Sequence, residues 1–129
     1  AVNVFMNSIL KNNPLTIFGD GTATRDFLYA NDLCLGIFKA FEKNLLGFNR
    51  IHLASGKETS VSQLAQTIIT ISGRKNYPIN YLPMRKGEVE KNFATYDFAK
   101  QVLNFEPKAS LQDALSETWD WFIDAKKMS

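Results

Sequence analysis

The sequence predicts a mixed α/β fold. In several segments apolar residues recur every three to four positions, as they do on one face of an amphipathic helix. Between those segments lie short runs of β-branched and aromatic residues, bounded by Gly, Asn, Asp and Pro. Two serines, each followed three positions later by Gln or Asp, mark helix starts. The expected order is helix, two strands, helix, strand, helix, strand, helix and helix, with about five helices in all.

The composition indicates a single domain and argues against nucleic-acid, metal and membrane binding. With 129 residues and 45% hydrophobic residues, the chain is long and apolar enough for one domain, residues 1–129. Its 15 basic and 13 acidic residues are interspersed, so we expect no nucleic-acid-binding surface. The lone Cys34 and lone His52 cannot form a Cys/His metal cluster, and a single thiol fits a reducing compartment. The sequence contains no membrane-length apolar run and does not open with the basic-then-apolar pattern of a signal peptide, so we expect no membrane partner and a cytoplasmic location. From the lone Cys34 and His52 we expect no metal.

The chain opens directly in a periodic apolar segment, which predicts a helix. Its apolar face comprises Val2, Phe5, Met6, Ile9 and Leu10. The residues that follow, KNNP at positions 11–14, end it, because proline cannot continue a helix. Since no polar lead-in precedes this helix, we expect the chain to be part of a longer protein.

Residues 15–30, LTIFGDGTATRDFLYA, predict a β-hairpin. Residues 15–18 form its first strand, residues 19–21 its turn, and residues 26–29 its second strand. Arg25 and Asp26 are charged residues at the start of the second strand, where a packed hairpin needs apolar side chains. The hairpin alone therefore does not explain them.

A helix from Asp32 to about Lys43 is expected next, capped by Asn31. Gly36 is a candidate for close packing. The apolar stripe of this helix comprises Leu33, Ile37, Ala40 and Phe41. A short strand is expected at residues 50–54.

Two capping boxes predict two further helices. Ser60 and Gln63 open a helix that ends at Gly73, and Ser110 and Asp113 open the final helix. The expected inner residues are Leu64, Ala65, Ile68, Ile69 and Ile71 in the first, and Leu111, Ala114, Leu115, Thr118, Trp119 and Phe122 in the last. Between them we expect a strand at 78–82, an irregular segment at 83–93 and a short helix at 97–103.

Tyr96 and Lys100 form a Tyr-x-x-x-Lys pair, which shares one face of a helix. In such a pair the lysine can lower the pKa of the tyrosine for proton transfer. No dinucleotide-binding fingerprint precedes the pair, and tyrosines and lysines are common here, so we interpret it as a solvated helix face.

Arg25 and Arg85 are the remaining candidates for chemistry. A guanidinium matches phosphate oxygens bidentately and stays charged at every relevant pH. Both arginines lie in irregular, glycine-containing segments, and two such loops could converge on one diphosphate. Surface salt bridges to Asp26 or Glu88 are the alternative explanation.

At these positions the chain resembles the C-terminal part of the extended short-chain dehydrogenase/reductase family, which includes nucleotide-sugar epimerases and dehydratases. The resemblance lies in three segments, NPLTIFGDGTATRDFLYANDL, IHLASGKETSVSQLAQTI and PMRKGEVEKNFATYDFAKQVLNFEPKASLQDALSETWDWF. It implies an α/β substrate-binding part that lacks the N-terminal Rossmann half.

The resemblance also implies binding roles for five residues. Arg25 and Arg85 match the arginines that contact the diphosphate, and Glu88 matches the acidic residue that hydrogen-bonds the ribose. Thr16 and Phe18 match the strand whose backbone pairs with the base, and the Phe18 ring is expected to pack against that base. In addition, we expect Asp26 to hold an arginine in place.

The resemblance implies that the intact enzyme is an NAD(P)-dependent nucleotide-sugar epimerase or dehydratase, which oxidises a UDP- or dTDP-sugar at C4. The dinucleotide fingerprint and the catalytic residues belong to the other half, so we expect this chain to hold no catalytic residue, to bind no NAD or NADP and to be inactive alone. We also expect self-association through apolar surface that the missing half would cover. A stand-alone nucleotide-binding or assembly module and an inactive truncation remain alternatives.

Overall fold

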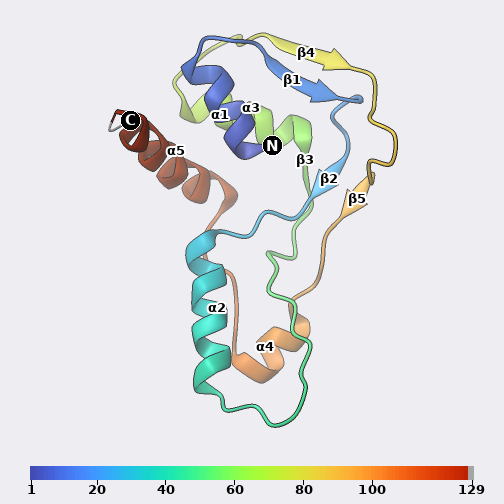
Figure 1. The fold of residues 1–129 in the computed structure, drawn as a ribbon, viewed down its shortest axis with the longest axis vertical. Coiled ribbons are helices and arrows are strands. Elements are labelled where there is room, and N and C mark those ends of the chain that lie inside the picture. The colour runs from blue at the N-terminus through green and yellow to red at the C-terminus, as the bar shows by residue number, and fades with distance from the viewer. Residues whose placement is uncertain (128–129) are drawn as a thin grey trace.

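The computed structural model describes residues 1–127, which contain five helices and five short strands (Figure 1). In chain order these are α1 (Val2–Leu10), β1 (Leu15–Phe18), β2 (Thr24–Arg25), α2 (Ala30–Glu42), β3 (Thr59–Ser60), α3 (Val61–Ile71), β4 (Ile79–Leu82), β5 (Lys91–Asn92), α4 (Asp97–Leu103) and α5 (Leu111–Lys127). The predicted mixed α/β class with about five helices is confirmed. No helix in this part of the chain is long and apolar enough to cross a membrane.

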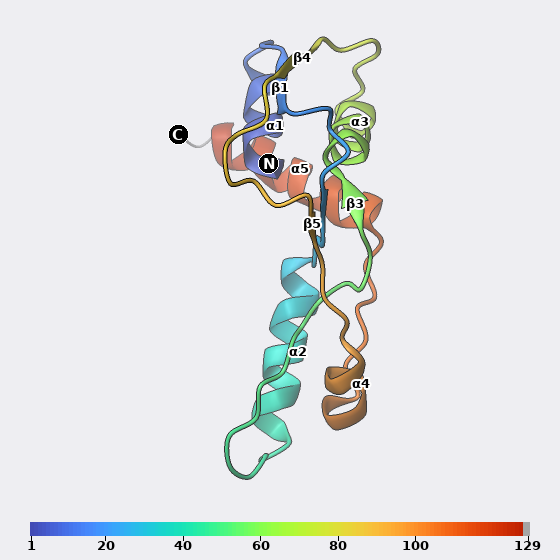
Figure 2. The ribbon, with the colours of Figure 1, turned by 90° about the vertical axis from the view of Figure 1, so that its right-hand side faces the viewer.

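The described residues pack into two hydrophobic clusters. The upper cluster joins α1, β1, α3 and α5, and its most buried side chains include Met6, Leu15, Leu64 and Ile68. The lower cluster centres on Ala99 and Leu103 of α4 and on Phe105, which follows this helix. In Figures 1 and 2, α2 and α4 extend away from the upper body, and extended segments connect the two regions.

The predicted hairpin is wrong. β1 pairs in parallel with β4, and residues 26–29 form no strand. The turn after β1 lies against the start of α3. A Cβ at Gly21 would lie 2.0 Å from the Ser62 hydroxyl oxygen, and the Ser62 amide donates to the Gly21 carbonyl.

β2 is the central strand of the second sheet. It pairs antiparallel with β3 and parallel with β5. Neither β3 nor β5 was expected, because each comprises only two residues within a polar stretch.

The α2 helix begins earlier than predicted, with Tyr29 as its N-cap residue, so the expected Asn31 cap is wrong. The Asn31 side chain donates instead to the Tyr29 hydroxyl. On the expected apolar stripe, Leu33, Ile37 and Phe41 are exposed, and only Ala40 packs against the lower cluster. The buried face of α2 carries Asp32 and Gly36.

Gly36 does lie at a close contact, as the sequence predicts. A Cβ at this position would lie 2.8 Å from the methyl groups of Leu53 and 3.0 Å from the Phe105 ring. Residues 50–54 pass beside α2 but are not a strand, because no segment within residues 1–127 pairs with them. Their side chains pack into the lower cluster instead.

Both predicted helix starts at serines are correct. Ser60 and Gln63 form a complete capping box, and Gly73 follows the end of α3 with φ +72°. At α5, the Ser110 hydroxyl accepts from the Asp113 amide and donates to the Asp113 carboxylate. Along α5, Leu115, Trp119 and Phe122 are buried as expected.

Candidate functional site

Two connecting segments run side by side at the candidate site. The segment between β1 and β2 is paired at both ends with the segment between β4 and β5, because β1 pairs with β4 and β2 pairs with β5. The Gly19 amide donates to the Leu82 carbonyl at 2.8 Å, and the Thr24 amide donates to the Glu90 carbonyl at 2.8 Å. Every predicted site residue belongs to these two segments or to the strands that border them.

Phe18 and Arg85 contact each other directly. The Cζ atom of Arg85 lies 3.7 Å from the centroid of the Phe18 ring, so the guanidinium covers one face of the ring. Phe18 is half-buried and Arg85 is exposed. The structure thus brings together two residues that the sequence proposed separately.

Glu88 lies close to Arg85 along the chain, in a tight turn. The Glu88 amide donates to the Arg85 carbonyl at 3.2 Å, and Gly87 has φ +85°. A positive φ at the third position of a four-residue turn favours glycine. The side chains of Arg85 and Glu88 are exposed at the two ends of this turn.

The outer edge of β1 carries Thr16 and Phe18. Backbone groups of successive strand residues point to opposite edges. Because Gly19 bonds to Leu82 of β4, the N–H and C=O groups of Phe18 and Thr16 point away from β4. In the part of the chain that the structure describes, β4 is the only strand beside β1. This edge therefore offers backbone donors and acceptors to a ligand.

Arg25 lies on β2, in the centre of its sheet, and is partly buried. One guanidinium nitrogen, Nη1, donates to the Thr24 carbonyl at 2.7 Å. Within residues 1–127, neither Arg25 nor Arg85 lies within salt-bridge distance of Asp26 or Glu88, which removes the alternative explanation for both arginines. The two arginines have different partners within residues 1–127, Thr24 for Arg25 and Phe18 for Arg85, so they are separate groups.

Asp26 does not hold an arginine, and that expectation is wrong. Its carboxylate accepts hydrogen bonds from the backbone amides of Ser55 at 2.9 Å and Gly56 at 3.0 Å. These bonds fix the loop before β3 beside the residue that follows Arg25. The sequence offered no signal for this pairing, because the partners are backbone groups distant along the chain.

Asp32 has a similar role that the sequence did not suggest. It is 7% exposed, and its Oδ2 atom accepts from the amides of Lys108 at 3.1 Å and Ala109 at 3.0 Å. This carboxylate anchors α2 to the segment that leads into α5. Its function is structural, because both partners are backbone groups.

The Tyr96 and Lys100 side chains both have structural partners. The Tyr96 ring packs edge-on against Phe105, with centroids 6.2 Å apart. Lys100 forms a salt bridge with Glu106 at 3.3 Å. The interpretation as a solvated helix face is therefore right for Lys100, which is exposed on α4, and wrong for Tyr96, which is the N-cap residue of α4 and packs against the lower cluster.

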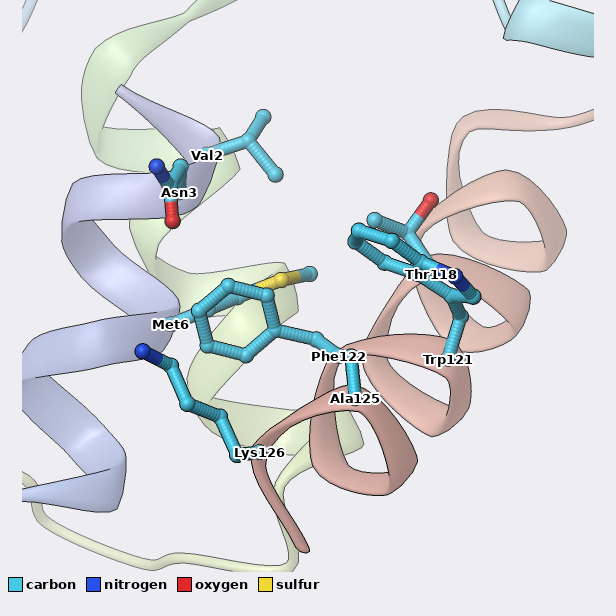
Figure 3. A pocket seen from close by; sticks show the side chains of 8 residues that line it. All are labelled: Val2, Asn3, Met6, Thr118, Trp121, Phe122, Ala125 and Lys126. Atoms are coloured by element: carbon cyan, nitrogen blue, oxygen red, sulfur yellow. The ribbon is translucent and has the colours of Figure 1, made fainter. Parts of the chain in front are cut away.

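A pocket with a volume of about 520 Å³ lies elsewhere, between α1 and α5 (Figure 3). Its lining comprises Val2, Asn3, Met6, Thr118, Trp121, Phe122, Ala125 and Lys126. In Figure 3 the Met6 and Phe122 side chains meet between the two helices, and Trp121 lies at the side. No predicted site residue lines it, and its few polar groups include no arginine, so we place the candidate site at the β1–β4 segments.

Within residues 1–127, no glycine-rich turn leads directly into the N-terminus of a helix. Cradles for a dinucleotide place a glycine-rich turn at the N-terminus of a helix. The turn containing Gly19 and Gly21 leads into β2, and Gly56 precedes β3. Among the described residues, no cluster of three or more His, Cys, Asp or Glu side chains could hold a metal ion.

Comparison with known proteins places the chain in a family. Residues 2–118 match the family described as GDP-mannose 4,6 dehydratase. A UDP-glucuronate 4-epimerase from Thermodesulfobacterium geofontis is 34% identical over 118 residues, which are 91% of this chain and 36% of that protein.

Solved structures of nucleotide-sugar epimerases are also similar to this chain. UDP-glucose 4-epimerase from Thermotoga maritima, crystallised with UDP-glucose, superposes with a TM-score of 0.86 at 34% identity over 97% of this chain and 40% of that chain. UDP-glucuronic acid 4-epimerase from Bacillus cereus, in complex with UDP-glucuronic acid and NAD, superposes with a TM-score of 0.89 at 31% identity over the same shares.

The chain therefore spans little more than a third of these relatives, and it matches their C-terminal part. The match includes nearly all of the described fold, from α1 into α5. This chain belongs to the GDP-mannose 4,6 dehydratase family, within the extended short-chain dehydrogenase/reductase group of nucleotide-sugar epimerases and dehydratases.

Proposed function

We propose that residues 1–129 form one nucleotide-sugar-binding unit of an NAD-dependent nucleotide-sugar epimerase or dehydratase. The observation that carries this proposal is the combination of a free strand edge on β1 with Arg85 over Phe18 at its end. The relatives crystallised with UDP-glucose and with UDP-glucuronic acid and NAD support the ligand class and the cofactor of the intact enzyme.

In this proposal each site residue has one task. The backbone of Thr16 and Phe18 hydrogen-bonds the base, as a free strand edge can. Arg25 and Arg85 bind the diphosphate, since guanidinium groups bind phosphate oxygens strongly and bidentately. Glu88 accepts a hydrogen bond from the ribose. Binding energy from this remote part of the substrate would then orient the sugar for reaction.

The chain's own residues supply binding and orientation only. Because the described residues place no glycine-rich turn at a helix N-terminus, we assign none of them to hydride transfer. We expect the chain alone to turn over neither UDP-glucose nor dTDP-glucose. Turnover by the purified chain would contradict this expectation.

Calorimetric titration with UDP and dTDP tests the binding role. Saturable binding that Arg25→Ala weakens about tenfold would support the site, because a charged hydrogen bond contributes about 1.5–3 kcal/mol. Arg50→Ala is the matched control, since Arg50 is an exposed arginine outside the site segments. No binding of either nucleotide, or equal losses in both variants, would overturn the proposal.

A second candidate function is assembly through the exposed face of α2 and the loop after it. The large apolar side chains exposed there are Leu33, Ile37, Phe38, Phe41, Leu46 and Phe48. Phe41 is 85% and Phe48 89% exposed, values that are unusual for phenylalanines. Contiguous apolar surface of this kind favours association, so we propose that the isolated chain forms homo-oligomers through it.

A further inference from the structure

The contact between Phe18 and Arg85 joins two separate segments of the chain. Phe18 ends β1, whereas Arg85 follows β4. With Cζ at 3.7 Å from the ring centroid, the guanidinium lies over the ring face. No Arg85 side-chain N–H group donates a hydrogen bond to another residue within 1–127, so these donors are left for other partners.

Backbone contacts fix both sides of this pair. Phe18 lies opposite Leu82 in the β1–β4 register, and the next amide, that of Gly19, donates to the Leu82 carbonyl at 2.8 Å. Beyond Leu82, the turn closed by the Glu88 amide and the Arg85 carbonyl holds the backbone of Arg85. The β1–β4 pairing therefore fixes the backbone of Phe18, and the turn fixes the backbone of Arg85.

The charge of Arg85 is not neutralised within residues 1–127, because no carboxylate there lies within salt-bridge distance of it. An exposed arginine side chain normally samples many rotamers, and fixing it on binding costs free energy. A ring that already holds the guanidinium in place reduces that cost. A guanidinium also offers a phosphate two parallel N–H donors, which a lysine ammonium does not.

We propose that Phe18 is a positioning residue that holds the Arg85 guanidinium ready for a diphosphate. This inference rests on the proposed function and adds a role for the Phe18 ring that acts through Arg85 and the phosphates. It differs from the expectation that the ring packs against the base. The two roles predict different losses when the ligand lacks phosphate.

Titration of UDP and uridine against Phe18→Leu separates the two roles. We expect the affinity for UDP to fall about two- to fivefold, the range that an exposed cation–π contact supports, and the affinity for uridine to stay unchanged. In the Arg85→Ala background, Phe18→Leu should have no further effect on UDP binding. Phe98→Leu, at an exposed phenylalanine outside the site segments, is the control. Equal losses for UDP and uridine, or a loss that persists without Arg85, would overturn the inference.

A ligand-free measurement keeps this inference separate from the proposed function. The side-chain protons of Arg85 should show upfield ring-current shifts in proton NMR spectra, and these shifts should disappear in Phe18→Leu. If UDP binds and the shifts are absent, the positioning role is wrong and the binding site stands. If UDP does not bind to the unmodified chain, the proposed function fails and the positioning role fails with it, whatever the shifts.

Discussion

The carboxylate of Asp26 accepts a hydrogen bond from the backbone amide of Ser55 at 2.9 Å. The neighbouring amide, that of Gly56, donates to the other carboxylate oxygen at 3.0 Å. One side chain thus satisfies two adjacent backbone donors in the loop that leads to β3. Since Asp26 directly follows Arg25, these bonds also fix the end of the strand that carries a proposed phosphate ligand.

We expect Asp26→Asn to lower the free energy of unfolding by about 2 kcal/mol, because two charge-assisted hydrogen bonds become weaker or are lost. Urea denaturation measures the change. Asp120→Asn, at an exposed position of α5, is the control and should change stability by less than about 0.5 kcal/mol. Equal stability of the two variants would show that the Asp26 bonds contribute nothing to folding.

Gly36→Ala should destabilise the chain by about 1–3 kcal/mol, although alanine favours helix more than glycine does. The added Cβ would lie 2.8 Å from Leu53 and 3.0 Å from Phe105, closer than packed carbon atoms approach. Cys34→Ala, at an exposed position of the same helix, carries no such clash and should be neutral or slightly stabilising. A Gly36→Ala variant as stable as the unmodified chain in thermal unfolding would contradict the observed packing.

Asp20 provides a test of pH dependence. The Thr22 hydroxyl and the Thr22 amide both donate to the Asp20 carboxylate. These bonds hold the pKa of Asp20 below its usual 3.8, and the hydroxyl has the larger effect. The resulting stabilisation is present above pH 3.8 and is lost as the pH falls through the lowered pKa of the folded state. In NMR titrations, Thr22→Val should raise the pKa of Asp20 toward 3.8, and Thr22→Ser should keep it low. An unchanged pKa in Thr22→Val would rule out the hydroxyl as the main cause.

Self-association through α2 can be tested by changing Ile37 and Phe41 together. Both are exposed on this helix, so Ile37→Lys with Phe41→Lys should preserve the fold and introduce repulsion between copies. We expect sedimentation velocity to show concentration-dependent oligomers for the unmodified chain and monomers for the double variant. Trp121→Lys, at the pocket between α1 and α5, should leave the oligomers intact. If Trp121→Lys abolishes them instead, the interface is at that pocket.

Local signals in the sequence predicted the helices well. The bounds of α4, Asp97–Leu103, agree with the prediction, and the Ser60 capping box opens α3 as expected. Such features depend on residues within a few positions of one another. The hairpin failed because a Gly-Asp-Gly turn between two apolar runs does not identify the partner strand. The close approach of Ser62 to Gly21 at this turn is likewise a tertiary contact.

The candidate site was only partly predictable for the same reason. The resemblance to known enzymes suggested Phe18 and Arg85 individually, and their stacking depends on the β1–β4 pairing that the sequence did not reveal. The role of Asp26 was mistaken, since its partners are backbone amides, which leave no mark in a sequence. Residue type alone could not distinguish an arginine partner from an amide partner.

Amide chemical-shift mapping with UDP tests the central claim, that this chain holds a nucleoside diphosphate at the β1–β4 segments. We expect saturable shifts at Thr16 and Phe18, at Arg25, and in the turn from Arg85 to Glu88. Shifts gathered around Trp121 and Phe122, or no saturable shifts at all, would contradict it.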